Sequence, residues 1–209
     1  MSEAASTDPE LIEVLEQHRI DASKVADWLG RQLGDAFDGQ VQIRQFQGGQ
    51  SNPAYHLATN LGAWVLRKKP PGQLLPSAHA VEREFRVMQA LGGSAVPVPR
   101  MLALCEDVSV IGTPFFVMQH VPGRLMGTRF AQHGTLAERR AINDDLIRVL
   151  AELHRVDWRA AGLEGFGRPE RYFERQLTRW AAQWEGSRTE PAPAMESLRD
   201  WLQAHVPDD

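Results

Sequence analysis

Positively charged side chains at the end of an apolar stretch are the first feature with chemical potential. Val65 and Leu66 are followed directly by Arg67, Lys68 and Lys69. Cations at the end of a buried strand can neutralise the phosphates of a nucleotide. Side chains alternate along a strand, which places Arg67 on the face of Val65 and favours it as the binding group. The alternative is a solvated basic strand end, and Lys68 stays open as a second phosphate ligand.

A glycine-rich turn precedes this basic segment. It contains Gly48, Gly49, Gln50, Ser51 and Asn52, and it lies between two stretches of alternating side chains. Consecutive glycines allow backbone N–H groups to converge on an anion, and a serine hydroxyl adds a donor. The turn therefore predicts a cover over phosphate groups. The alternative is an ordinary hairpin turn, in which glycine provides positive φ.

Two carboxylates follow the basic segment. Glu82 and Glu84 lie in a stretch whose apolar residues keep helical spacing up to Leu91. A helix carboxylate can hold a strand cation through a charge-assisted hydrogen bond. Taken alone, the two residues are better explained as an exposed mixture of glutamate and arginine, in which a pair contributes about 0–1 kcal/mol.

An apolar stretch that ends in a short linker is the fourth feature. Residues 114–118 are nearly all apolar, and Pro122-Gly123 ends the segment. An extended linker at this point could offer backbone N–H and C=O groups to the edge of an adenine. Met118, Gln119 and Val121 lie at that junction. The alternative is a buried strand followed by its turn.

The elements that would position these residues follow from changes in hydrophobic period. Helical spacing predicts short helices over 11–15 and 25–33. Alternation predicts strands over 41–46, 54–59 and 63–68, and two later strands are predicted over 101–104 and 114–118. A main helix ending at Leu91 separates the two sets. After Gly123 only helices are predicted, over 135–154, 169–184 and 195–205. Thr135 and Glu138 form a capping-box pattern at the first.

This order of elements predicts an α+β fold with a protein-kinase-like arrangement. We expect a five-stranded antiparallel sheet with one main helix, followed by the beginning of a helical lobe. The expected parts are an N-terminal tail and helix over 1–22, a nucleotide-binding lobe ending in a hinge over 23–120, and a partial helical lobe over 121–209.

Composition limits the classes of protein and of partner. The 209 residues are 43% hydrophobic and 24% charged, which is typical of a soluble domain with a core. A formal net charge of −4 provides no basic field, so we expect neither nucleic acid nor membrane as a partner. No apolar run approaches the roughly 18 residues of a membrane span. The single cysteine and the polar N-terminus, without a secretory pattern, predict a cytoplasmic location.

Taken together, the segments resemble a known family. They are Gly48–Pro53, Val65–Gly72, Glu82–Met88, Val96–Pro99, Gly112–Met118 and Ala151–Asp157. Their residues and order resemble the aminoglycoside phosphotransferase/choline kinase superfamily, which has a protein-kinase-like fold. Within it, the chain is most similar to the branch associated with acyl-CoA dehydrogenases.

The resemblance implies an ATP-dependent phosphotransferase that acts on a small-molecule hydroxyl, with ATP and Mg²⁺ as cofactors. It implies that the backbone around Gly48–Ser51 covers the ATP phosphates. Arg67 would take the place of the family's strand lysine, with Glu84 as its helix partner, although a guanidinium is less compact than an ammonium. Gln119 and Val121 would flank the adenine through backbone groups.

The family's catalytic carboxylate and Mg²⁺ ligands belong to a His-Gly-Asp…Asn loop and a following Asp, which this sequence does not contain; its last asparagine is Asn143. We therefore expect a C-terminally truncated chain, inactive by itself. We expect Trp180, Trp184 and Trp201 to be incompletely covered, which would allow a homo-oligomer to form through the helical lobe. The alternative is a non-catalytic, pseudokinase-like binding or interaction module, or an accessory domain linked to acyl-CoA dehydrogenase metabolism.

Overall fold

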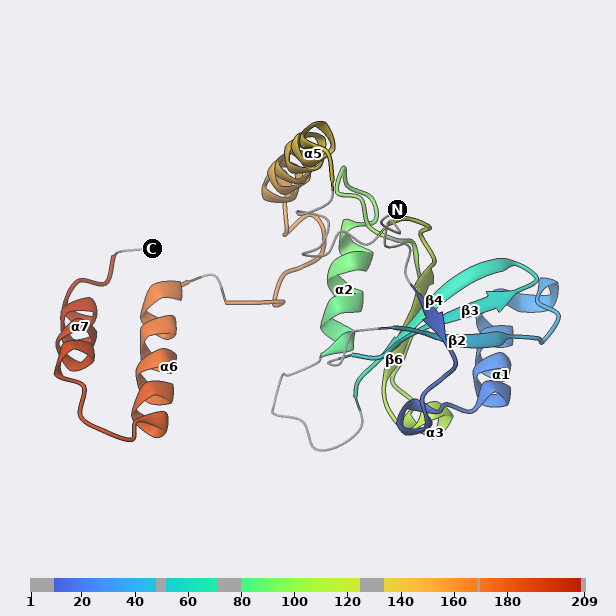
Figure 1. Cartoon of the computed structure of the whole chain (residues 1–209), viewed down its shortest axis with the longest axis horizontal. Helices are drawn as coiled ribbons and strands as arrows, with labels where there is room; N and C mark the ends of the chain where they lie inside the picture. The colour runs from blue at the N-terminus through green and yellow to red at the C-terminus, as the bar shows by residue number, and fades with distance from the viewer. Residues whose placement is uncertain (1–9, 48–51, 71–79, 125–133, 169, 208–209) are drawn as a thin grey trace, which may run out of the picture. The chain divides into compact units, whose positions relative to one another are not determined.

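The structure, a computed structural model, describes residues 10–47, 52–70, 80–124, 134–168 and 170–207 (Figure 1). The chain divides into two compact units, Met1–Gly162 and Leu163–Asp209, each of which is described by itself. The expected division at 22 and 120 stays a prediction.

The first unit contains a six-stranded antiparallel sheet with the order β1-β2-β3-β4-β6-β5. The strands are β1 (Leu11–Ile12), β2 (Gln42–Phe46), β3 (Ala54–Thr59), β4 (Gly62–Lys68), β5 (Met101–Cys105) and β6 (Phe115–Gln119). The five strands predicted from the sequence are confirmed within one or two residues. The α+β, kinase-like fold is therefore confirmed, and the number of strands is corrected to six.

The additional strand replaces a helix that was expected over 11–15. Leu11 pairs with Phe46 and Ile12 with Gln45, so β1 covers the outer edge of β2. A short 3₁₀ helix, η1 (Glu16–His18), follows. An edge strand has backbone groups that need partners, and this long-range pairing outweighs the helical spacing of a few apolar residues.

One face of the sheet carries the main core. Helix α1 (Ala22–Leu33), the short α3 (Val108–Ile111) and the 3₁₀ helix η2 (Gly34–Ala36) belong to this side, and Figure 1 shows α1 and α3 together there. Asp21 caps α1 by accepting hydrogen bonds from the backbone N–H groups of Ser23 and Lys24. The buried residues of this core include Val25, Trp28, Leu29, Tyr55, Leu57, Leu66, Phe115 and Val117.

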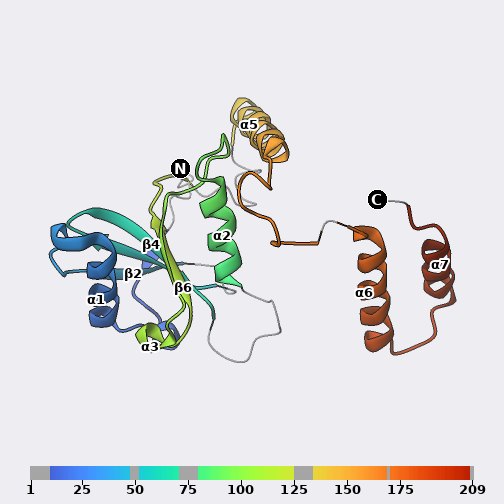
Figure 2. The same ribbon diagram turned by 180° about the vertical axis from the view of Figure 1, so that it is seen from behind.

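The opposite face is partly covered by helix α2 (Val81–Leu91). Val81 and Phe85 pack against Phe116, with Met88 and Met118 at the margin. Figures 1 and 2 show α2 on the side of the sheet away from α1. In the described residues, α2 makes its main contacts with β5 and β6.

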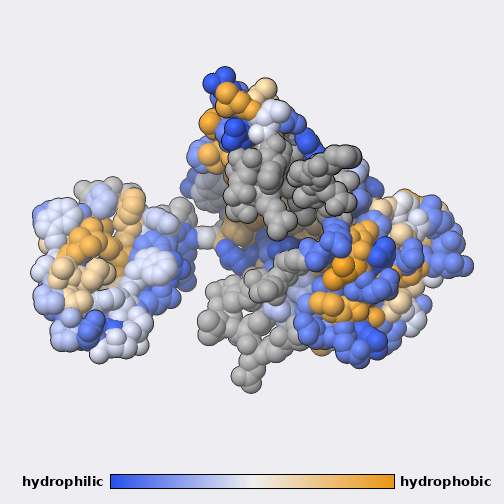
Figure 3. All heavy atoms as spheres, viewed as in Figure 1, coloured by the Kyte–Doolittle hydropathy of each residue, from blue (hydrophilic) through white to orange (hydrophobic). Residues whose placement is uncertain are grey.

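Helix α5 (Leu136–Arg155) begins as the sequence predicts. The Thr135 hydroxyl accepts a hydrogen bond from the Glu138 backbone N–H, and the Glu138 carboxylate accepts one from the Thr135 backbone N–H. The predicted capping box is therefore confirmed. The helix also carries exposed apolar side chains: Leu136, Leu146, Ile147, Leu150 and Leu153. Figure 3 shows hydrophobic surface on this helix beside hydrophilic surface.

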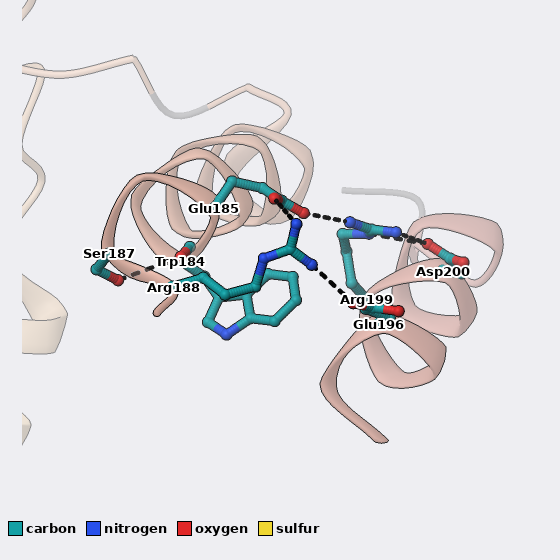
Figure 4. Close-up of polar contacts among 7 residues, drawn as sticks. All are labelled: Trp184, Glu185, Ser187, Arg188, Glu196, Arg199 and Asp200. Atoms are coloured by element: carbon teal, nitrogen blue, oxygen red, sulfur yellow. Dashed lines mark hydrogen bonds and ion pairs between the residues drawn. The ribbon is translucent and has the colours of Figure 1, made fainter. Parts of the chain in front are cut away.

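The second unit is a pair of helices, α6 (Tyr172–Ser187) and α7 (Pro193–Ala204). Arg188 donates to Glu196 at 2.7 Å and Arg199 to Glu185 at 2.8 Å, which ties the helices together. Both guanidinium groups lie over the Trp184 ring, at 5.3 and 5.9 Å (Figure 4). Trp180 and Trp201 remain exposed, as the sequence predicts, whereas Trp184 is half-buried. None of the helices in the described residues is both long and apolar enough to cross a membrane.

Candidate functional site

An ion pair joins the central strand to α2. Arg67 Nε donates to Glu84 Oε2 at 2.7 Å, and a second guanidinium nitrogen, Nη2, lies 3.5 Å from Oε1. Strand alternation directs Arg67 toward α2, because the neighbouring Leu66 faces the core under α1. Each of the two charged side chains is 35% exposed. The pairing expected from the sequence is therefore present, and it remains within reach of a ligand.

Asn52 completes this cluster from the other side. Its Nδ2 donates to Glu84 Oε1 at 3.0 Å, and its side chain is buried beside β3. Glu84 thus holds both Arg67 on the strand and Asn52, the last residue of the glycine-rich turn. The Asn52 Oδ1 is buried and lacks a hydrogen-bond partner among the described residues. A buried acceptor without a partner is costly, and such atoms often belong to functional sites.

A second ion pair lies beside the first. Lys69 Nζ donates to Glu82 Oε1 at 2.7 Å. Burial opposes ionisation of Glu82, but the Lys69 hydrogen bond and charge outweigh it and lower the pKa of Glu82. Glu82 and Glu84 thus have separate partners, and the sequence expectation that Glu84 is the partner of Arg67 agrees with the geometry.

Lys68, the other predicted phosphate ligand, lies on the opposite face. Its ammonium is 5.9 Å from the centre of the Tyr55 ring, within the core under α1. Burial lowers its pKa. The alternation that directs Arg67 toward α2 directs Lys68 away from it. The structure therefore does not bring Lys68 to the cluster of Arg67, Glu84 and Asn52.

The predicted hinge residues lie at the end of β6. Met118 is opposite Val65 and is half-buried. The Gln119 backbone N–H donates to the Arg100 carbonyl at 2.8 Å, so this donor is used within the sheet. Val121 is 61% exposed, and no backbone hydrogen bond involves it in the described part of the chain. The predicted contact of Gln119 and Val121 with an adenine through backbone groups stays a prediction, and the Gln119 N–H is not available for it.

Four of the predicted site residues lie outside the described residues: Gly48, Gly49, Gln50 and Ser51. Their role as a phosphate cover stays a prediction. Asn52, the last residue of the same motif, is described and contacts Glu84.

A group of aromatic rings on the α2 side of the sheet is not among the features predicted from the sequence. His56 and His120 are 4.9 Å apart between ring centroids, and Phe46 lies about equally far from both, at 6.0 and 6.1 Å. Alternation along β3 predicts that His56 lies opposite to the buried Tyr55 and Leu57, so its face could be predicted. The approach of His120 to His56 depends on the register of the sheet, so the sequence alone could not predict this contact.

The chemistry of these residues fits an anionic ligand. A guanidinium has five N–H groups, and Glu84 accepts from one on Nε and one on Nη2. Nη1 makes no hydrogen bond in the described part of the chain. A carboxylate that holds the cation from behind orients these N–H groups outward. An antiparallel sheet with a strand cation anchored by a helix carboxylate is the arrangement of a kinase-like phosphotransferase domain.

Comparisons with known proteins agree with this class. Residues 42–209 match the model of the phosphotransferase enzyme family, so the chain belongs to that family. Human acyl-CoA dehydrogenase family member 11 is 38% identical over 211 residues, and mouse acyl-CoA dehydrogenase family member 10 is 45% identical over 175. These alignments cover 100% and 84% of this chain, but only 27% and 16% of the relatives.

A solved structure supports the fold. The crystal structure of a provisionally assigned aminoglycoside phosphotransferase from Ralstonia eutropha superimposes with a TM-score of 0.76 at 44% identity. The match covers 91% of this chain and 55% of that protein. The chain thus spans about half of this structural relative and about a quarter or less of the dehydrogenase-named relatives.

Proposed function

We propose that the α2-facing side of the sheet binds ATP, with the phosphates at Arg67. In this proposal the chain is the nucleotide-binding part of a cytoplasmic enzyme that phosphorylates a hydroxyl group of a small molecule. The observation that supports it best is the cluster of Arg67, Glu84 and Asn52 at the end of β4. Family membership supports a phosphotransferase role.

The cluster explains how a surface arginine could bind phosphate specifically. A free arginine side chain loses considerable rotamer entropy when it binds. Here Glu84 already holds the guanidinium in place, and Asn52 holds the Glu84 carboxylate. The part of the guanidinium not used by Glu84 is therefore preorganised to contact an anion.

Phosphoryl transfer also requires Mg²⁺, which neutralises charge on the β- and γ-phosphates. The described residues contain no group of three or more His, Cys, Asp or Glu side chains that could hold a metal ion. We therefore assign no residue of the described part of the chain to Mg²⁺, and the proposal concerns the nucleotide.

The decisive experiment is a calorimetric titration of the full chain with ATP and MgCl₂. Glu84→Gln should weaken binding about tenfold, because it removes the charge that orients Arg67. Glu82→Gln is the matched control: it removes a neighbouring carboxylate on the same helix and should change the affinity less than about twofold. Absence of ATP binding by the wild type, or equal losses in the two variants, would contradict the proposal.

Turnover separates the enzyme from its main alternative. A non-catalytic binding module would bind ATP but would show no phosphoryl transfer even in a longer protein that carries this chain. The acceptor panel should include aminoglycosides and hydroxylated acyl-CoA esters, because the names of the relatives suggest both. Transfer of ³²P from ATP to any hydroxyl acceptor would support the enzyme, and binding without transfer would support the module.

A further inference from the structure

Three aromatic rings form a compact cluster on the α2-facing side of the sheet. We name Phe46, His56 and His120 the aromatic cluster. The two imidazoles meet edge to face at 4.9 Å with an interplanar angle of 85°, and Phe46 stacks against His120 at 6.1 Å and 25°. All three side chains are partly exposed.

The register of the sheet places this cluster in line with Arg67. Ala54, Arg67 and Phe116 form one row across β3, β4 and β6, and the next row on the same face is His56, Val65 and Met118.

His120 follows in the third row, where its backbone N–H donates to the Ala63 carbonyl at 3.1 Å. Ala63 is four residues from Arg67 along β4, which is about 13 Å in a strand. A nucleoside triphosphate extended along β4 from Arg67 would bring its base to the aromatic cluster.

The histidine pair has uncommitted hydrogen-bonding groups. No hydrogen bond to either imidazole is found in the described part of the chain, although a neutral imidazole has one N–H donor and one acceptor. The surroundings favour the neutral form of His56. Burial is the main cause that lowers the pKa of His56, and the charges of His120 and Arg44 lower it further.

The charged neighbours of this pair are few. Arg44 on β2 lies opposite His56. Its Nη2 donates to the Leu11 carbonyl, and its Nε lies 3.8 Å from Glu13 Oε1. On β4, the residue opposite His56 is Val65, which does not titrate.

We propose that His56 and His120 contact the base of the bound nucleotide and determine the affinity of the site for it. This inference rests on the proposed function, because it requires that the phosphates bind at Arg67. The rings provide a surface on which a purine can stack, and their nitrogens match the donor and acceptor atoms on the edge of adenine. The phosphates contact other residues, so the two parts of the ligand can be tested separately.

The test compares ATP with inorganic tripolyphosphate, which has no base. The full chain is titrated with each ligand as wild type, His56→Leu and His120→Leu, with His154→Leu on α5 as the control. Each cluster variant should bind ATP about tenfold more weakly, as expected for a lost base–aromatic contact. Its affinity for tripolyphosphate should stay within about twofold of the wild type, and His154→Leu should change neither affinity.

The outcomes separate this inference from the proposed function. If the variants lose ATP and tripolyphosphate equally, the histidines have a structural role, and the inference is wrong while the proposed function stands. Unchanged ATP affinity would also refute base contact. If the wild type binds neither ligand, the proposed function itself fails.

A second measurement does not depend on the folding of variants. In the wild-type chain, the imidazole proton resonances of His56 and His120 should shift when ATP is added and should not move with tripolyphosphate. Identical shifts with the two ligands would overturn the inference.

Conservative variants separate the ring from its nitrogen atoms. Phenylalanine at position 56 or 120 keeps an aromatic ring and should weaken ATP binding by about threefold.

Discussion

Arg67 on β4 donates a hydrogen bond to Glu84 on α2, with 2.7 Å between Nε and Oε2. A second contact joins Nη2 to Oε1 at 3.5 Å. The bond fixes the guanidinium against the helix that covers this side of the sheet. Since both side chains remain 35% exposed, the pair is not simply part of the core. This geometry leads to testable expectations for stability and for ligand binding.

Substitution of Arg67 should separate charge from geometry. Arg67→Met removes the cation and should weaken ATP binding by about 30-fold or more, because a charge-assisted phosphate contact contributes about 2 kcal/mol. Arg67→Lys keeps the charge but cannot form the two-pronged contact with Glu84, so a loss of about threefold is expected. Calorimetry on both variants measures the difference. Equal affinities of Arg67→Met and the wild type would exclude Arg67 as a phosphate ligand.

Asn52→Asp should destabilise the fold in a pH-dependent way. The new carboxylate would face Glu84 across the 3.0 Å contact that the amide now makes, at a cost of about 2 kcal/mol near neutral pH. Repulsion would raise the pKa of the new Asp in the fold, so the cost should shrink as pH falls and the group is protonated. Urea unfolding at pH 7.5 and pH 5 tests this. Asn52→Ala lacks the charge and should show no such recovery at low pH.

Lys68→Met should stabilise the protein. The ammonium is buried, its pKa is lowered by burial, and its neighbour is the Tyr55 ring. A methionine of similar length should raise the free energy of unfolding by about 1 kcal/mol. Lys68 binds its proton more tightly in the unfolded chain than in the fold, so the stability of the wild type rises as the pH approaches the ordinary lysine pKa of 10.5. The stability gained by Lys68→Met should therefore become smaller at high pH. Thermal unfolding at pH 7 and pH 9.5 measures both effects, and a destabilised variant would contradict the expectation.

The lowered pKa of His56 predicts an acid-sensitive fold. A histidine whose pKa is lowered in the folded state binds its proton better when the chain is unfolded. Protonation of His56 therefore lowers the free energy of unfolding as the pH falls below about 6.5. His56→Leu should reduce the loss of thermal stability between pH 7.5 and pH 5.5. Equal pH slopes for the wild type and the variant would show that His56 does not contribute.

Local pattern predicted the elements around the cluster well. The strand over 54–59 has the same limits in the structure as in the prediction, and the alternation of β4 correctly placed Arg67 opposite to Leu66. The Thr135 and Glu138 capping box was also readable, since all its atoms lie within one turn. These features depend on neighbours in the sequence.

Long-range contacts explain what the sequence did not reveal. Leu11 and Phe46 pair across 35 positions, and helical spacing gives no indication of that contact. The aromatic cluster arises in the same way, because β3 and the end of β6 are brought together by the register with β4. The sequence leaves Lys68 open as a phosphate ligand because a strand can lose its alternation at its end. In the structure the alternation continues to the last residue of β4, so Lys68 lies on the face of Leu66.

The most direct test is a map of where ATP binds on the folded chain. Backbone amide resonances of the ¹⁵N-labelled protein are followed while ATP and MgCl₂ are added. The largest shifts are expected at Asn52, Arg67 and Glu84, with little change in α1 and α3 on the other face. Shifts confined to α1 and α3, or to the α6–α7 unit, would contradict binding at the Arg67–Glu84 pair.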